Sequence, residues 1–256
     1  MHAAQRESMI LELLQERGFI SFQELDRRLT ASPATLRRDL ERLHTDGKVV
    51  RVRGGVRAPS EAASTSGLTG IPFHENVKKN LAAKLAIGRT AAALCSAGQS
   101  VIIDGGSTTL QMCPHLEPLG LQVLSNSLHI VSALLPQPNT RVSIPAGAIF
   151  REQNIVLSPY DEDGMHSYRA SKMFMGAASI GRHGLMQSDV ILIQAERRLI
   201  DRADELVLLA DSSKFDAPAG HAVCALEDID VIVTDRAIAD EHRKLVEAAG
   251  VKLIIA

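Results

Sequence analysis

Residues 32–56 read SPATLRRDLERLHTDGKVVRVRGGV and decide how the first part of the chain folds. Ser32 is a strong helix N-cap, and Pro33 occupies the first helical position, where its missing N–H leaves no hydrogen bond unmade. The leucines of this stretch recur at a helical spacing, at Leu36, Leu40 and Leu43. One face of the helix must therefore point into a core. The stretch predicts a helix that ends near Gly47 and exposes its basic side chains.

Two further amphipathic patterns precede this helix. The first combines apolar residues at helical spacing with a terminating glycine, at Ile10, Leu13, Leu14 and Gly18. In the second, Ser21 and Glu24 form an S-x-x-E capping box ahead of a new apolar face. The segment KVVRVRGGV after the third helix favours a two-stranded wing with a glycine turn. This is the pattern of a winged helix-turn-helix, whose third helix enters the DNA major groove. The alternative is a solvated helix in another kind of small helical module.

The run ISFQELDRRLTASPATLRRDLERLHTDGKVVRVRGGV resembles the N-terminal domain of the DeoR family of bacterial repressors. That family carries a similar S-x-x-T-h-R-R-D-L run and a G-G wing. The resemblance implies operator binding by the exposed face of the third helix and by the wing, and arginines there would neutralise phosphates or read guanine. The residues expected to contact double-stranded DNA are Ser32, Ala34, Thr35, Arg37, Arg38, Arg42, Arg51 and Arg53.

The charge of the chain is divided unevenly. Residues 1–57 hold 11 Lys+Arg and 8 Asp+Glu, whereas the remaining residues hold 17 and 22. A basic end on an acidic body points to nucleic acid. The three well-separated cysteines indicate buried thiols in a reducing cytoplasm. We expect no membrane span, because no apolar run is long enough, and no metal site or cofactor, because the histidines are scattered.

The segment that follows the wing is rich in Ser, Ala, Gly and Pro. We expect a winged helix-turn-helix domain over 1–57, a linker over 58–75 and an α/β domain over 76–256. In this last part, apolar runs alternate with helical patterns, which favours a mostly parallel sheet covered on both faces. The expected strands are 100–103, 121–124, 141–144, 206–210, 231–234 and 251–255. The expected helices are 77–93, 109–115, 128–135 and 240–249.

Sheets of this kind bind ligands at the carboxyl ends of their strands, and three expected strands end in small polar residues. DGGSTT (104–109) offers free N–H groups and hydroxyls that suit a phosphate, although a plain strand-to-helix turn is the alternative. SNS (125–127) fits helix capping and ligand contact equally well. ADSSKF (210–215) places Lys214 just beyond a strand, where it would pair with a phosphate or serve as an ordinary surface lysine.

In this order and spacing, the three runs resemble the sensor domain of the DeoR family, which is similar in fold to sugar-phosphate isomerases. The resemblance implies binding of a phosphorylated sugar or related metabolite. The residues expected to bind this effector are Asp104, Gly105, Gly106, Ser107, Thr108, Thr109, Asn126, Gly147 and Lys214. The run MFMGAASIGRHGLMQSD resembles the branch with the ascorbate-utilisation repressor. Ala146 and Asn76 depart from a usual glycine and arginine, whereas Lys84 is kept, so the particular effector stays open.

The main alternative is a sugar-phosphate isomerase-like enzyme fused to a DNA-binding module. Such chemistry needs a general base, for which Asp104, Asp189 and Asp211 are candidates by position. No paired acidic motif accompanies the phosphate loop, however, and no G-x-S-x-G motif is present, so we expect no catalytic residues. A body that only oligomerises would leave DGGSTT and ADSSKF unexplained. We therefore expect a cytoplasmic repressor of a carbohydrate-utilisation operon, assembled as a homo-oligomer (dimer or tetramer).

Overall fold

The helix predicted from SPATLRRDL is present as α3, Pro33–Thr45. Ser32 Oγ accepts a hydrogen bond from Thr35 N–H at 3.2 Å, which is the expected N-cap. The three leucines of the helix are at most 3% exposed and form the centre of a small core with side chains of the two preceding helices. The inward-facing leucines therefore fix which side of α3 faces solvent.

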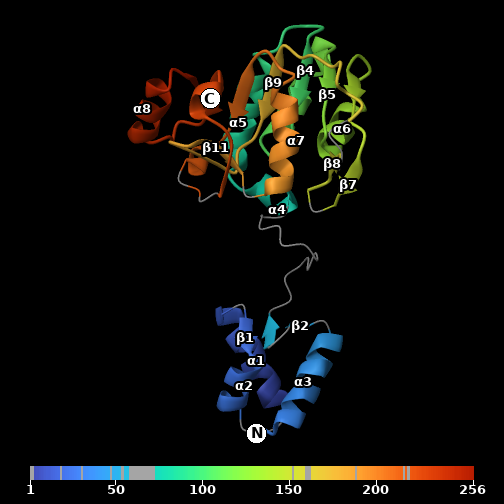
Figure 1. Ribbon diagram of the computed structural model, residues 1–256, viewed down its shortest axis with the longest axis vertical. Helices are drawn as coiled ribbons and strands as arrows, with labels where there is room; N and C mark the ends of the chain where they lie inside the picture. Colours follow the sequence, from blue (N-terminus) through green and yellow to red (C-terminus); the bar gives the residue numbers. More distant parts are fainter. Residues whose placement is uncertain are drawn as a thin grey trace. The chain divides into compact units, whose positions relative to one another are not determined.

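The structure is a computed structural model, and Figure 1 shows its elements. It describes residues 3–17, 19–29, 31–46, 48–52, 55–57, 73–151, 153–158, 163–187, 189–215, 217 and 220–256. The chain divides into two compact units, residues 1–67 and 68–256. The linker expected over 58–75 lies largely outside the described residues, so its boundaries stay a prediction.

The first unit combines three helices with a small sheet. Its other elements are α1 (Ala3–Arg17), β1 (Phe19–Ser21), α2 (Phe22–Arg28), β2 (Val50–Val52) and β3 (Gly55–Arg57). β2 pairs antiparallel with β3, as the predicted wing requires, and β1 adds an unexpected third strand on the other side of β3. Arg6 Nε donates to Asp39 Oδ2 at 2.7 Å, which ties α1 to α3 through a poorly exposed ion pair.

The second unit is built on a seven-stranded sheet in the order β15-β14-β12-β9-β4-β5-β6. All of its pairings are parallel. Its strands are β4 (Ser100–Ile103), β5 (Gln122–Leu124), β6 (Arg141–Ser143), β9 (Lys172–Met175), β12 (Leu206–Leu209), β14 (Val231–Thr234) and β15 (Lys252–Ile255). Six of the seven were predicted, so the expected mostly parallel α/β fold is confirmed.

The strand missing from the prediction, β9, lies at the centre of the sheet between β4 and β12. Its sequence KMFM starts with a charged residue and holds no β-branched side chain, so it gives a weak strand signal. In the structure, Met173, Phe174 and Met175 are at most 1% exposed. Burial on both faces stabilises this segment as a strand, and that tertiary effect is not visible in the local pattern.

Helices cover both faces of the sheet, and the strand side chains alternate between two cores. The helical elements are α4 (Phe73–Lys78), α5 (Leu81–Ala92), η1 (Thr109–His115), η2 (Glu117–Leu119), α6 (Leu128–Leu134), α7 (Val190–Ile200), η3 (Ser212–Lys214), η4 (Leu226–Asp228) and α8 (Asp240–Ala248). One core joins Ile102 and Leu208 to α7 and α8, and the other joins Val101 and Val207 to α5, η1 and α6. Figure 1 shows α7 crossing one face of the sheet.

In the larger unit, five strands outside the main sheet were not predicted. A hairpin is formed by β7 (Ala148–Phe150) and β8 (Ile155–Leu157), and a second sheet by β10 (Ser179–Gly181), β11 (Gly184–Gln187) and β13 (His221–Cys224). The helix α7 was also not predicted.

Two predicted helices differ in detail. The helix expected over 77–93 is broken before α5 by Asn80, which has a left-handed backbone with φ 54°. The helix expected over 109–115 is a 3-10 helix, because Pro114 lacks the N–H that an α-helical turn would use. Residues 109–115 therefore form a tight turn against α5 rather than a regular helix.

We expect Gly88→Ala to lower the thermal midpoint of unfolding. A Cβ at this position would lie 2.5 Å from the carbonyl carbon of Gln111, in the backbone of η1. Overpacking typically costs about 1–3 kcal/mol, which exceeds the roughly 1 kcal/mol that alanine gains over glycine inside a helix. Gly181→Ala is the control, since a Cβ there meets nothing within 4 Å. Equal midpoints for the two variants would contradict the close packing of α5 on η1.

Candidate functional site

The residues expected to contact DNA lie on the solvent side of α3. Ser32, Ala34, Arg37 and Arg38 are exposed, and Thr35 is half-buried. The hydroxyl groups of Ser32 and Thr35 lie 2.9 Å apart and hydrogen-bond to each other at the start of the helix. The side chain of Arg51 and the whole of Arg53 lie outside the described residues, so the wing contacts stay a prediction.

The three arginines of α3 differ in their surroundings. The Arg37 guanidinium lies 5.3 Å from the ring centroid of Phe22, which holds it in a cation–π contact. Arg42 Nη2 lies 3.0 Å from Glu7 Oε2 in α1, and the same carboxylate also binds Lys48. Within the described residues, Arg38 makes no ion pair. We therefore rank Arg38 above Arg42 as a DNA contact.

The residues expected to bind an effector gather at the carboxyl edge of the large sheet. Asp104 follows β4, Asn126 follows β5, Gly147 follows β6 and Lys214 follows β12. In the strand order, β12 and β6 are four intervals apart. At roughly 4.8 Å per interval this separation is about 19 Å, which is longer than one phosphorylated monosaccharide. Lys214 and Gly147 therefore belong to different parts of the edge.

Thr109 fixes the shape of the DGGSTT loop. Its hydroxyl donates towards the carbonyl oxygens of Asp104 at 2.8 Å and Gly106 at 2.9 Å, and the residue is fully buried. A Cβ on Gly106 would lie 2.9 Å from the same hydroxyl oxygen, and a Cβ on Gly105 would lie 2.9 Å from Ile155 Cγ2. Packing therefore requires both glycines, and the Thr109 hydroxyl holds the loop rather than a ligand.

The charges of Asp211, Lys214 and Lys79 act on Lys84 near the end of β12. Burial lowers the pKa of Lys84 to about 8, the charge of Asp211 opposes this, and Lys214 and Lys79 lower the pKa further. Burial also lowers the pKa of Lys214. The charge of Asp211 raises this pKa, and the charge of Lys79 lowers it. Lys84 is 1% exposed and its Nζ donates to the carbonyl oxygen of Asn76. The cluster carries more positive than negative charge, which suits an anion.

Asp211 is itself held in place by the residues around it. Its Oδ1 accepts hydrogen bonds from Asn80 Nδ2 at 2.7 Å and from the N–H of Ser213 at 3.2 Å. Asn80 is the left-handed residue before α5, so this contact joins the start of α5 to the end of β12. The sequence resemblance kept Lys84 but gave it no role, and the structure brings it to Lys214.

A pair of buried carboxyl groups was missed by the sequence analysis. Glu196 of α7 is 6% exposed, as is Asp104. Burial raises the pKa of Glu196 to about 8, and the nearby charge of Asp104 raises it too. Burial raises the pKa of Asp104 to about 6, while hydrogen bonds from the N–H of Gly105 and from Asn126 lower it. The sequence analysis noted the absence of a paired acidic motif beside the phosphate loop; the second carboxyl group comes instead from α7, far away in the sequence.

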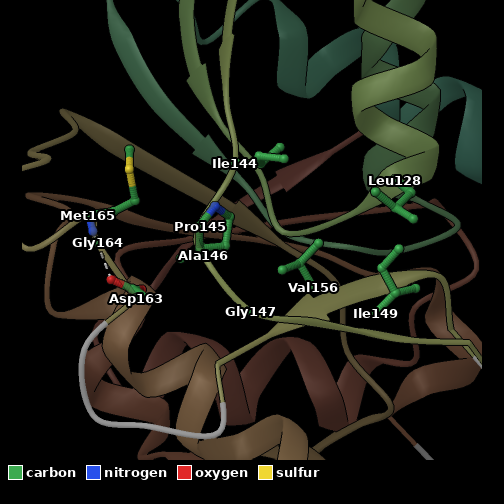
Figure 2. A pocket seen from close by; sticks show the side chains of 10 residues that line it. All are labelled: Leu128, Ile144, Pro145, Ala146, Gly147, Ile149, Val156, Asp163, Gly164 and Met165. Atoms are coloured by element: carbon green, nitrogen blue, oxygen red, sulfur yellow. Dashed lines mark hydrogen bonds between the residues drawn. The ribbon is translucent and has the colours of Figure 1, made fainter.

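A cavity of about 550 Å³ lies at the far end of the same edge. Figure 2 shows Leu128, Ile149 and Val156 on one side and Asp163 and Met165 on the other. Its lining is mainly apolar, and its one carboxylate forms a bidentate ion pair, at 2.7 and 2.8 Å, with Arg202. Such a lining does not match the hydroxyl groups of a sugar.

Gly147 lines this cavity, apart from the lysine cluster. A Cβ there would lie 2.4 Å from the carbonyl oxygen of Leu157, so the close approach to β8 requires glycine. The lysine cluster and the cavity therefore offer two chemically different places for a ligand. Of these, only the lysine cluster offers charge for a phosphate.

The described residues offer neither a candidate metal site nor a membrane-spanning helix. They hold no group of three or more His, Cys, Asp or Glu side chains placed to bind a metal ion. They also include no helix long and apolar enough to cross a membrane.

We expect the stability of the protein to depend on the charge of Glu196. A carboxyl group whose pKa is raised by folding binds its proton more tightly in the folded state, so its contribution is lost as pH rises towards that pKa. The advantage of wild type over Glu196→Gln in free energy of unfolding should therefore shrink from pH 5 to pH 8. Urea unfolding at several pH values measures this, and the titration of Lys84 cancels because both proteins contain this lysine. A difference that is constant with pH would contradict the raised pKa. Glu241→Gln, at an exposed position of α8, is the control.

Family models match both parts of the chain. Residues 6–62 match the DeoR-like helix-turn-helix domain, and residues 79–236 match the DeoR C terminal sensor domain. The HTH-type transcriptional regulator UlaR of Shigella dysenteriae serotype 1 (strain Sd197) is 30% identical over 254 residues, which covers 99% of this chain and 99% of that protein. UlaR of Escherichia coli (strain K12 / DH10B) gives the same identity and coverage.

Two kinds of solved structure are similar to part of this chain. Ribose 5-phosphate isomerase A from Methanocaldococcus jannaschii covers 54% of this chain and 55% of that chain, with 18% identity and a TM-score of 0.40. The eIF2B-beta2-delta2 complex from C. thermophilum covers 59% of this chain and 46% of that chain, with 17% identity and a TM-score of 0.41. Likenesses at these scores carry no functional argument.

The relatives that match over almost the whole chain are named as transcriptional regulators. The two family models match the first and the second part of the chain in the expected order. The chain therefore belongs to the DeoR family of helix-turn-helix transcriptional regulators.

Proposed function

We propose that the protein binds operator DNA through α3 and the wing, and that a phosphorylated sugar or related metabolite controls this binding from the carboxyl edge of the large sheet. The main support for effector binding is that Lys84 and Lys214 interact electrostatically with Lys79 and with the carboxylate of Asp211. Two partly desolvated ammonium groups next to each other repel, and an anion at this position removes the repulsion.

The position of the lysine cluster also favours a phosphate. The cluster follows β12, and the DGGSTT loop follows β4, with only β9 between them. Gly176, the residue directly after β9, lies close to Gly106. A Cβ on Gly106 would lie 3.8 Å from Gly176 Cα. We propose that the two loops bind the phosphate together, with Ser107 and Thr108 contributing hydroxyl and N–H groups.

The proposal that the protein binds DNA rests on the exposed arginines of α3 and on the family to which the chain belongs. A single recognition helix has limited affinity, and operators are usually read by symmetric assemblies, so we propose a homo-oligomer held by the larger unit. A repressor of a carbohydrate-utilisation operon, acting in the cytoplasm, fits this arrangement. An effector that lowers the affinity for DNA would then switch the operon on.

Isomerase-like chemistry is the second candidate, and the carboxyl pair of Asp104 and Glu196 favours it. A carboxyl group with a pKa near neutrality is suited to general acid–base catalysis. Both groups are nearly fully buried, however, so a substrate has little access to them. We propose that the protein is not an enzyme.

A band-shift titration tests the proposal. The full chain is bound to DNA from upstream of the neighbouring genes, and a panel of sugar phosphates is added. We expect one compound or a small group to change the fraction of bound DNA, with no conversion of that compound detectable by chromatography. Turnover of the active compound would favour the enzyme, whereas failure of the whole panel to change DNA binding would contradict the effector class.

We expect Arg38→Ala to weaken operator binding more than Arg42→Ala. Arg38 is exposed near the start of α3, whereas Arg42 is paired with Glu7. Loss of one phosphate or base contact costs about 1–3 kcal/mol, which corresponds to a roughly 5- to 150-fold change in affinity. Fluorescence anisotropy at fixed salt measures both variants. A larger loss for Arg42→Ala would place the DNA on a different side of α3.

We expect Lys214→Ala to leave DNA affinity unchanged and to raise the effector concentration needed for half-maximal response by at least about tenfold. One charged hydrogen bond contributes roughly 1.5–3 kcal/mol, so its loss has an effect of this size. Lys252→Ala, at an exposed position of β15, is the matched control. If Lys214→Ala responds at the wild-type concentration, the phosphate lies elsewhere.

A further inference from the structure

Helix α4 is the first element of the larger unit that the structure describes, so its N-terminal end leads along the chain to the DNA-binding unit. The ring of Phe73, its first residue, stacks on the imidazole of His129, with ring centroids 4.0 Å apart and planes 6° apart. His129 lies in the first turn of α6, directly after the SNS loop, and Asn154 Nδ2 donates to its Nε2 at 3.1 Å. The start of α4 is therefore attached to the carboxyl edge beside β5.

The last turn of α4 is attached to the same edge by Lys84. Lys84 Nζ donates to the carbonyl oxygen of Asn76 and lies 3.4 Å from Asn76 Oδ1. The last four carbonyl groups of a helix have no partner within it, so the ammonium group satisfies one of them. Lys84 is only 1% exposed. The ammonium group that the proposed function assigns to a phosphate is thus already bound to a peptide carbonyl of α4.

The side of α5 that carries Lys84 faces the loop after β12. The N–H of Lys84 donates to the carbonyl oxygen of Asn80 at 3.1 Å, so the two residues are one turn apart and share a side of the helix. Asn80 Nδ2 donates to Asp211 Oδ1 at 2.7 Å and to Ser213 Oγ at 3.1 Å. Lys214 is the next residue, and its charge acts on Lys84. Lys84 therefore stands between α4 and the loop to which we assign the phosphate.

A phosphate at this loop competes with the carbonyl oxygen of Asn76 for Lys84. The carbonyl group offers a dipole, whereas a phosphate offers a full negative charge, and the difference grows where water is excluded. A phosphate also removes the repulsion between Lys84 and Lys214, which a neutral carbonyl group leaves in place. An anion bound at the loop therefore draws the ammonium group away from Asn76, and α4 loses one of its two attachments.

We propose that α4 is a latch on the effector site, closed while Asn76 occupies Lys84 and opened when the phosphate of the effector takes its place. This inference rests on the proposed function, which assigns the phosphate to the lysine cluster. Opening frees the end of α4 from which the chain continues to the DNA-binding unit, so that the presence of effector changes how this unit is held. Phe73 and His129 form the second attachment and are positioning residues: they set how much effector opens the latch.

A latch predicts tighter binding when its attachment is removed. Closure of α4 and binding of a phosphate exclude each other, so a variant that favours the open state has a higher apparent affinity for phosphate. A residue that merely shapes the site has the opposite effect, since its loss weakens binding. Loss of the ring stack in Phe73→Ala should raise the affinity by roughly 2- to 12-fold, the range that one aromatic pair supports.

Calorimetric titration of the full chain at pH 7.5 and constant ionic strength measures this, with inorganic phosphate and glucose 6-phosphate as the probes. We expect tighter binding of at least one probe by Phe73→Ala, and weaker binding by Lys214→Ala. Phe150→Ala, which removes another half-buried ring, from β7, is the matched control and should stay within about twofold of wild type. Equal or weaker binding by Phe73→Ala, with loss of binding in Lys214→Ala, would overturn the latch and leave the proposed function intact. Binding of neither probe to any of these proteins would overturn both.

A tryptophan at the stack observes the movement itself. The chain contains no tryptophan, so Phe73→Trp introduces a single one. At saturating probe we expect its fluorescence to shift to longer wavelength, because the indole ring leaves His129 for water. The double variant Phe73→Trp/Lys84→Met should show no shift, since it has no ammonium group to exchange. Unchanged emission in Phe73→Trp, or an equal shift in Phe150→Trp, would overturn the opening of α4.

The link to DNA binding is tested in the band-shift assay without effector. Phe73→Ala should change the affinity for DNA at least about twofold in the direction in which the active compound changes it for wild type, because part of its population is already open. Wild-type DNA affinity in Phe73→Ala, together with its tighter binding of phosphate, would overturn transmission of the signal through α4.

Discussion

Burial of a parallel sheet on both faces is the constraint on which the larger unit depends. Helices α5, α6 and α7 cover the two faces, so the strand side chains form two dry cores and offer nothing to a ligand. Polar groups can only gather where the strands end, and parallel pairing brings all of these ends to one edge. The placement of Asp104, Asn126 and Lys214 follows directly from this arrangement, although they are far apart in the sequence.

Local signals were sufficient for the three helices and the wing of the first unit and for most of the large sheet, although β1 was not expected. The capping serine, the proline at the first helical position and the spaced leucines define α3 without help from the rest of the chain. The strands built from Val, Ile and Leu were equally clear. The central strand β9 was missed because its lysine and methionines acquire strand character only through burial between β4 and β12.

The candidate site was less accessible to sequence reasoning, because its interactions join distant residues. The order of DGGSTT, SNS and ADSSKF located the edge, but it did not show that the Thr109 hydroxyl is used by the loop itself. Lys84 and Glu196 enter the site from α5 and α7, respectively. Glu196 shares the buried face of α7 with Leu192 and Leu199, and an acidic residue on such a face was the signal that could have found it.

The edge therefore combines a lysine cluster at the end of β12 with the buried carboxyl groups of Asp104 and Glu196. In the proposed function, the lysine cluster receives the phosphate of the effector. A crystal structure of the full chain with the compound that changes its DNA binding tests this most directly. The account predicts the phosphorus atom between residues 106–109 and Lys214. A ligand seated instead in the apolar cavity beside Gly147 would contradict it.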